Sequence, residues 1–286
     1  MTHASVSLTL ALKRHGCEFL NSCNVPFAAI FSKKAKKQVR KYEKENFTVK
    51  IDIATLFPEM CENYFSQSVV GRARKKGIFE INCHNIRDYT TDKHNRVDDT
   101  PYSERQGMLM QAEPIYRCFE QVTNGKDKPH VIFMSPQGQV LTQKKCVELS
   151  KMENIFILCG HYEGVDQRVL DEIVDEEISI GDYVLTGGEL GAMVLVDSVV
   201  RMLDGVLSKA DCYEDESHFS GLLEYPQYTR PEEWHGKKVP EVLLSGHHAN
   251  ILKWRREQSL LVTAKKRPDM IDWDTLTDKE KELLQT

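Results

Sequence analysis

The sequence predicts an α/β protein, with a largely parallel sheet flanked by helices and a small, mainly helical C-terminal domain. From Lys50 onward, short apolar segments of strand length alternate with longer segments of helical periodicity, which is typical of a parallel sheet covered on both faces. After Ser245, a residue type that favours helix N-caps, the pattern is helical. A chain of 286 residues is long enough for both domains.

The main domain is expected to begin with a strand at 50–57, where apolar and polar residues alternate until Pro58. A single helix is expected over 59–76, because a basic run closes this segment and Gly77 suits a C-terminal cap. Further strands are predicted at 79–86, 130–134 and 154–159, and further helices at 113–123, 142–152 and 164–174.

The segment 178–190 contains two turns, one at Gly181 and one at the pair Gly187 and Gly188. Adjacent glycines permit positive φ and allow another backbone or a ligand to approach closely. Taken alone, the same pattern also fits a tight turn before a packed helix, with no ligand bound.

A helix is expected to start at Glu189 or Leu190 and to stop before Gly205. On this helix Asp197 and Arg201 are four residues apart, so the carboxylate is expected to orient the guanidinium.

The composition is that of a globular protein, with 41% hydrophobic and 28% charged residues. No apolar run approaches the length of a membrane span, so no membrane association is expected. The eight cysteines contain no C-x-x-C pair, which argues against a zinc site or a redox dithiol and favours a reducing, cytoplasmic location.

Residues 1–49 are basic, with nine Lys or Arg against three Glu, so the remainder carries a net charge of −11. Bulk charge therefore does not indicate a nucleic-acid-binding protein, and any such binding must use local patches. The leader has several interpretations: an organelle transit peptide, a basic run that touches RNA phosphates, a solvated and disordered tail, or an artefact of the assigned start. The last is favoured, because the first convincing strand begins near Lys50.

Three loops follow predicted strands, at 134–138, 160–166 and 178–190. In parallel sheets, ligands bind beyond the carboxyl ends of the strands. Neither the G-x-G-x-x-G fingerprint nor a P-loop motif occurs, so dinucleotide and nucleoside triphosphate sites are disfavoured.

Six segments together resemble the bacterial tRNA (guanine-37-N1) methyltransferase family, from about Lys50 to the end of the chain. They are LFPEM at 56–60, SPQG at 135–138, GHYEGVD at 160–166, IGDYVLTGGEL at 180–190, LLEYPQYTRP at 222–231 and LLSGHHA at 243–249.

The resemblance implies a trefoil-knotted domain at 50–207 that binds S-adenosyl-L-methionine in a bent shape, a flexible linker at 208–219 and a tRNA-binding helical domain at 220–286. It also implies a homodimer, assistance by Mg²⁺, and methylation of N1 of the guanosine next to the anticodon, which maintains the reading frame. The cofactor is expected to contact twelve residues: Met134, Ser135, Pro136, Gly160, Ile180, Gly181, Asp182, Tyr183, Val184, Leu185, Gly187 and Gly188.

Guanine N1 carries a proton at neutral pH, so methylation needs a base, and charge that develops toward O6 needs a fixed cation. Arg201 suits the cation, being always charged and planar. The family's aspartate base corresponds to Glu216, and Asp215 next to it is the alternative. Glu163 matches a family glutamate near the reacting methyl group, and it is expected to hold the metal with Glu216.

The chain departs from the family where Ser103-Glu104-Arg105-Gln106 replaces a run of glycines near the target guanine. Arg105 is expected to compensate by stacking on or pairing with the base. Trp254 is either a core anchor or a stacking platform, with the core favoured. The tRNA-binding residues are expected to be Tyr102, Arg105, Lys253, Arg255, Arg256, Lys265, Lys266 and Arg267.

Two other functions stay open from the sequence. One is a related knotted methyltransferase with a different RNA acceptor. The other is an RNA-binding relative without catalytic turnover, which the altered loop at 103–106 would permit.

Overall fold

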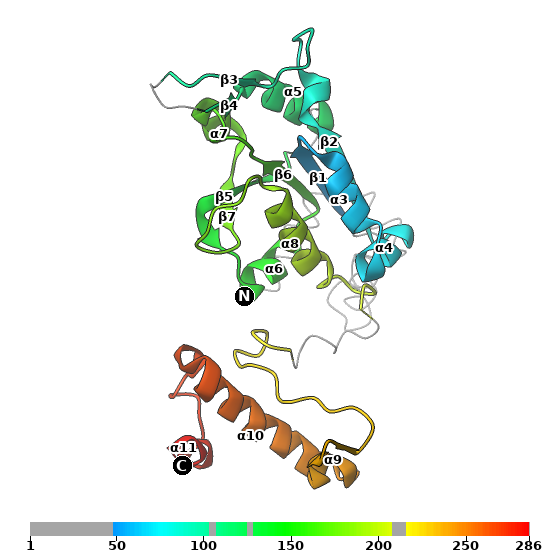
Figure 1. Ribbon diagram of the computed structural model, residues 1–286, viewed down its shortest axis with the longest axis vertical. Coiled ribbons are helices and arrows are strands. Elements are labelled where there is room, and N and C mark those ends of the chain that lie inside the picture. The colour runs from blue at the N-terminus through cyan, green and yellow to red at the C-terminus, as the bar shows by residue number, and fades with distance from the viewer. Residues whose placement is uncertain (1–47, 103–106, 125–127, 208–215, 286) are drawn as a thin grey trace, which may run out of the picture. The chain divides into compact units, whose positions relative to one another are not determined.

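The computed structural model describes residues 48–102, 107–124, 128–207 and 216–285 (Figure 1). Contacts between Cα atoms divide the chain into Met1–Val49 and Lys50–Thr286. The predicted leader lies outside the described residues except for its last two positions, as do the predicted site residues Arg105 and Asp215.

The central sheet has five strands in the order β2-β1-β6-β5-β7. β1 pairs in parallel with β6, β6 with β5, and β5 with β7. β5 is buried over 131–135 and β6 over 155–159, as expected for strands covered on both faces. The predicted α/β class with a largely parallel sheet is therefore confirmed. The strands are β1 (Val49–Thr55), β2 (Phe79–Asn85), β5 (His130–Val140), β6 (Asn154–Cys159) and β7 (Glu176–Ser179).

Helices cover both faces of this sheet (Figure 1). On one face, α5 (Ala112–Thr123) and α7 (Gln167–Ile173) form a core with alternate residues of the central strands, such as Phe133 and Phe156. On the other face, α6 (Gln143–Leu149) and α8 (Glu189–Val200) pack against the intervening strand residues, such as Ile132 and Ile157. The alternation of strand side chains therefore builds the two apolar layers.

The prediction of a single helix over 59–76 is wrong, because the structure has α3 (Pro58–Phe65) and α4 (Ser68–Lys75). Ser68 has a φ of 54°, a left-handed conformation that interrupts the helical repeat. Gly71 lies so close to the preceding turn that a Cβ there would stand 2.2 Å from the Ser66 carbonyl oxygen. The predicted cap is confirmed, since Gly77 follows α4 with a φ of 68°.

A smaller antiparallel pair precedes α5 in the chain. It consists of β3 (Asp98–Asp99) and β4 (Leu109–Met110), which follow the 3₁₀ turn η2 (Ile86–Tyr89). The main-chain N–H of Met110 donates to the Gly164 carbonyl, which attaches this pair to the loop after β6.

The C-terminal region is mainly helical, as predicted, and has its own small apolar core of Leu222, Leu260, Ile271 and Leu276. The N-cap of its long helix is His247 rather than the predicted Ser245. No helix in the described part of the chain has the length and apolar character needed to cross a membrane. The elements are β8 (Glu233–Trp234), β9 (Lys237–Lys238), α9 (Glu241–Leu244), α10 (His248–Lys266), η4 (Pro268–Met270) and α11 (Asp278–Gln285).

Candidate cofactor pocket and catalytic residues

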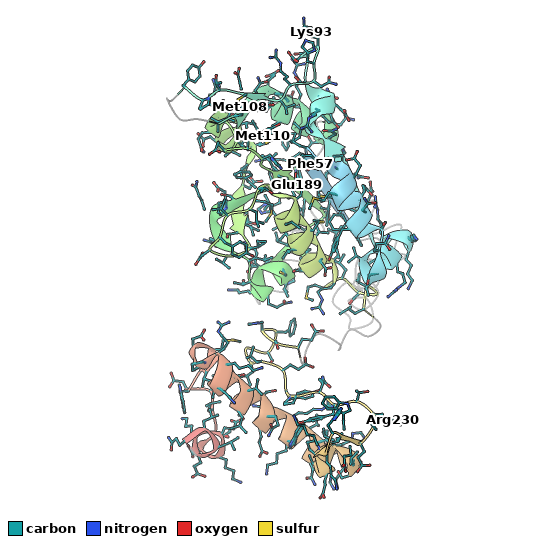
Figure 2. All side chains as sticks on the ribbon, viewed as in Figure 1. Phe57, Lys93, Met108, Met110, Glu189 and Arg230 are labelled. Carbon is teal, nitrogen blue, oxygen red and sulfur yellow. The ribbon has the colours of Figure 1, made fainter. Side chains whose placement is uncertain are left out.

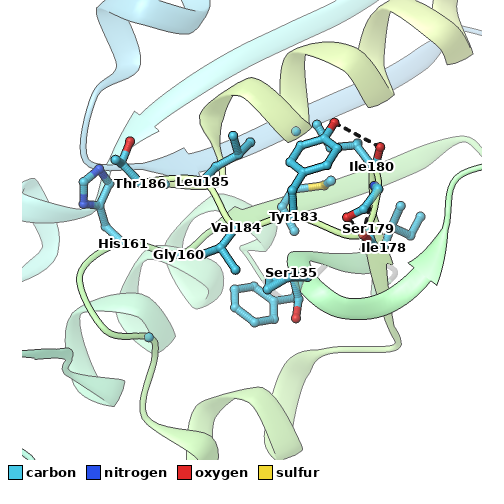
Figure 3. A pocket seen from close by; sticks show the side chains of 18 of the residues that line it. Ser135, Gly160, His161, Ile178, Ser179, Ile180, Tyr183, Val184, Leu185 and Thr186 are labelled. Atoms are coloured by element: carbon cyan, nitrogen blue, oxygen red, sulfur yellow. Dashed lines mark hydrogen bonds between the residues drawn. The ribbon is translucent and has the colours of Figure 1, made fainter.

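A pocket opens at the carboxyl ends of β6 and β7, beside a bulge in the middle of β5 (Figure 3). It encloses about 710 Å³ of empty space, its open mouth included. Its wall comes from residues 133–136 of β5 and from the loops at 160–164 and 180–188. The sequence predicts the last two loops as ligand-binding, and parallel pairing brings them to one edge. The predicted end of a strand at 134, with a loop at 134–138, is wrong, because β5 continues through its bulge to Val140.

β5 is irregular in its middle, after Met134. The pairing of β5 with β7 is interrupted between Met134 and Gln139, where β5 bulges. The Gln137 main-chain N–H donates to the Ser135 hydroxyl at 3.1 Å, which closes the bulge. Gly138 passes so near β7 that a Cβ would stand 2.4 Å from the Glu177 carbonyl carbon.

The loop at 180–188 is shaped by its glycines. Gly181 has a φ of 148° and lies beneath the Tyr183 ring, whose hydroxyl donates to the Ile180 carbonyl at 3.2 Å (Figure 3). Gly188 lies against β6, where a Cβ would stand 2.8 Å from the Cys159 Cα, and its N–H donates to the Gly160 carbonyl at 2.9 Å. At these glycines the main chain therefore lies against neighbouring atoms, and side chains there would displace the pocket wall.

Glu163 lines the same pocket and is exposed. Its main-chain N–H donates to the Met108 carbonyl at 3.0 Å. A Cβ on Gly107 would stand 2.3 Å from the Glu163 Cγ, so the chain before β4 packs directly on this side chain. Among the described residues, no cluster of three or more His, Cys, Asp or Glu is arranged to hold a metal ion.

Arg201, the residue after α8, forms a two-point ion pair with Glu216. The Arg201 Nη1 and Nη2 donate to the two Glu216 carboxylate oxygens at 2.7 and 2.9 Å. This hydrogen bonding raises the pKa of Arg201 further, against the opposing effect of burial. The predicted cation and predicted base are therefore in direct contact.

The expectation that Asp197 orients Arg201 by a hydrogen bond is wrong. The Asp197 carboxylate instead accepts from the Tyr64 hydroxyl of α3 at 2.5 Å. That hydrogen bond is the main reason that the pKa of Tyr64 is raised to about 12. Asp197 acts on Arg201 through charge alone, as a lesser contribution to its raised pKa.

The ion pair and the pocket lie at opposite ends of α8. Gly191 lines the pocket and Arg201 follows the last turn, so the helical rise separates them by about 15 Å along the axis. Within one chain, Glu163 and Glu216 therefore belong to different places, and the structure does not bring the two predicted metal ligands together.

The family model described as tRNA (Guanine-1)-methyltransferase TrmD matches residues 49–273. The chain belongs to this family. Curated relatives include the tRNA (guanine-N(1)-)-methyltransferases of Ruminiclostridium cellulolyticum, 57% identical over 78% of this chain and 97% of the relative, and of Clostridium acetobutylicum, 52% identical over 82% and 96%. The relative from Clostridium botulinum is 52% identical over 83% and 98%. The resemblance found in the sequence is thus confirmed.

Eleven of the twelve expected cofactor residues of this TrmD-family chain line the pocket, and Asp182 does not. The pocket also contains residues that were not predicted, among them His161, Thr186 and Gly191. His161 and Thr186 lie inside the segments at 160–166 and 180–190 that resemble the family, so the sequence contained a signal for them. Gly191 lies outside these segments and reaches the pocket because of the direction of α8.

Three of the six expected tRNA-binding cations in the C-terminal region form ion pairs. Lys253, Arg256 and Arg267 form ion pairs with Glu257, Glu280 and Asp269. Lys265 and Lys266 have no ion-pair partner within the described residues.

Arg255 and Trp254 lie beside aromatic rings, whereas Tyr102 is exposed. The Arg255 guanidinium lies 4.7 Å from the Tyr225 ring centroid. Trp254 is half-buried beside Tyr225 and Tyr228 and lies outside the apolar core cluster. Tyr102 is fully exposed at the edge of the described chain.

Proposed function

We propose that this protein transfers the methyl group of S-adenosyl-L-methionine to N1 of guanosine 37 in tRNA. The observation that carries the proposal is the pocket at the β5 bulge and the ends of β6 and β7, whose lining residues lie within the part of the chain matched by the TrmD family model. The names of the relatives support the acceptor, a guanine N1 in tRNA. A tRNA substrate would place the reaction in the cytoplasm. The trefoil knot and the limits at 50–207, 208–219 and 220–286 remain proposals that rest on the family.

The residues present fit the cofactor. The main chain of the 180–188 loop offers N–H and C=O groups for an adenine and ribose, and the N–H groups of Val184 and Leu185 have no acceptor within the described residues. Gly160 and Gly188 keep side chains out of the space beside β6. When bound, the sulfonium supplies an electrophilic methyl group.

We assign the chemistry at the acceptor guanine to Glu216 and Arg201. In the proposed mechanism, a Glu216 carboxylate oxygen removes the proton from guanine N1, and the Arg201 guanidinium donates to O6 as charge develops there. The ion pair joins the two groups to each other at 2.7 and 2.9 Å, so they lie side by side for one guanine edge that displaces part of this contact. Asp215 remains the alternative base.

We also propose that the active protein is a homodimer. The distance of about 15 Å along α8 separates the Arg201 pair from the pocket of the same chain, so a second copy is needed to bring them together. An exposed apolar face supports this, with Met60 and Tyr64 of α3 beside Leu190 and Val194 of α8 between 42% and 47% exposed. A dimer would also be the setting in which Glu163 and Glu216 of different copies hold Mg²⁺ together.

The proposal is tested by transfer of a radiolabelled methyl group from S-adenosyl-L-methionine to a tRNA transcript with guanosine at position 37. Labelling is expected with this transcript and not with one that has adenosine at position 37. Labelling of both transcripts would favour a methyltransferase with another acceptor. Cofactor binding by calorimetry without labelling of either would favour an RNA-binding relative without turnover.

A further inference from the structure

A buried polar pair lies behind the pocket. Thr55, the last residue of β1, is fully buried, and Glu189, the first residue of α8, is 4% exposed. The Thr55 hydroxyl donates to the Glu189 Oε1 at 2.7 Å, and the Phe57 main-chain N–H donates to the same hydroxyl oxygen at 3.0 Å. Figure 2 labels Phe57 and Glu189, which lie near each other in the view.

This pair is attached directly to the loop that lines the pocket. Glu189 follows Gly187 and Gly188, and its Oε2 would stand 2.4 Å from a Cβ placed on Gly187. The Phe57 ring packs on His161, another lining residue, with 5.1 Å between ring centroids. The end of β1 therefore supports two pocket loops, although no residue of β1 lines the pocket itself.

Stability alone does not explain a carboxylate in this place. A buried carboxylate costs free energy unless it is hydrogen-bonded, and an apolar pair of the same size would pack without that cost. The middle of the loop at 180–186 is exposed, with Tyr183 at 55% and Val184 at 81%. Its ends are held instead, by the Ser179 hydroxyl bonded to Gly181 at the start and by Gly188 and Glu189 at the finish.

We propose that Thr55 and Glu189 are positioning residues that hold the 180–188 loop in its ligand-binding shape before the cofactor arrives. A loop that is already ordered loses less conformational entropy on binding, so the pair should raise cofactor affinity. This inference rests on the proposed function, because it takes S-adenosyl-L-methionine as the ligand of the pocket.

The test measures the Kd of S-adenosyl-L-methionine by calorimetry on the full chain, well below the unfolding temperature. Thr55→Val removes the hydroxyl and leaves Glu189 without its donor, so binding should weaken about tenfold. Thr55→Ser restores the hydroxyl and should bind within about twofold of the parent. Glu189→Gln keeps an acceptor oxygen without the charge and should weaken binding less than Thr55→Val.

Thr263→Val is the matched control, because Thr263 is also fully buried and its hydroxyl donates to the Ser259 carbonyl at 2.6 Å in the C-terminal core region. It should lower the melting temperature without changing the Kd. If Thr55→Val and Glu189→Gln also lower only the melting temperature, the pair is merely structural and the inference is overturned. Absence of binding by the parent chain would instead overturn the proposed function.

Discussion

At the scale of single residues, the contact between Arg201 and Glu216 depends on the shape of the guanidinium as well as on its charge. Its two terminal nitrogens contact both oxygens of Glu216, an arrangement that needs the planar fork of arginine. A lysine would keep the positive charge but offer a point contact. The same fork would have to reach guanine O6 in the proposed reaction.

Arg201→Lys is therefore expected to slow single-turnover methyl transfer about 100-fold or more, the usual cost of losing one donor to a developing oxyanion. The Kd of S-adenosyl-L-methionine should not change. The control is Arg168→Lys, since Arg168 also contacts its partner, Asp166, through two nitrogens but is exposed and outside the pocket lining. Equal rates for Arg201→Lys and the parent would contradict the role of the guanidinium.

At the scale of elements, β5 and β7 are joined at their starts by a charged network. Glu176 accepts from His130 at 2.6 Å and from Lys145 at 2.9 Å. Burial raises the pKa of Glu176, but these hydrogen bonds outweigh it and leave the pKa below its ordinary value. A carboxyl group whose pKa is lowered by folding stabilises the fold above its unfolded pKa and loses that contribution as pH falls.

Glu176→Gln should accordingly lower the melting temperature at pH 7, and the difference from the parent should shrink steadily below about pH 4.5. Thermal unfolding followed by circular dichroism from pH 7 to pH 3.5 measures this. Glu148→Gln is the control, because Glu148 contacts Lys145 only at 3.5 Å and is about half exposed. A pH-independent difference for Glu176→Gln would show that packing, not charge, is responsible.

The end of α10 gives a second element-scale prediction. Lys265 and Lys266 lack ion-pair partners within the described residues, whereas Arg267 is bound to Asp269 at 2.6 Å. Free cations release counterions on contact with phosphates and so set the salt dependence of RNA binding. Changing both lysines to Gln should weaken tRNA binding and flatten its dependence on salt. Arg267→Gln should change the slope less, and equal slopes for all three proteins would contradict a phosphate contact by the lysines.

At the scale of the whole molecule, local patterns in the sequence are sufficient for the fold class, and the resemblance to the family supplies the expected pocket residues. Buried apolar segments predict β6 and the first half of β5, and the loops after β6 and β7 meet because the strands are parallel. The continuation of β5 to Val140 depends on its pairing with β7 through a bulge, which local patterns do not predict. Tertiary contacts were not predictable in this way. Spacing along α8 suggested that Asp197 holds Arg201, but Tyr64 from α3 takes that carboxylate. The helix expected over 59–76 is broken at Ser68, which has a positive φ that the local sequence does not predict.

The separation of the Arg201 pair from the pocket leads to a test of the assembly. A chain with Arg201→Ala keeps an intact pocket, and a chain with Gly188→Val keeps an intact Arg201 but should not bind the cofactor, since the new side chain collides with Cys159. Each variant alone should be inactive.

In a mixed dimer, one of the two sites would combine the intact pocket of one copy with the intact Arg201 of the other. Random pairing makes half of the dimers mixed, so co-expression of the two variants should restore about a quarter of the parent activity. Mixed dimers purified with two different affinity tags each have one working site of two, so methyl transfer at about half of the parent activity would support a site shared between copies. If both variants fold and pair but no activity returns, each site is completed within a single chain, which contradicts a site shared between copies.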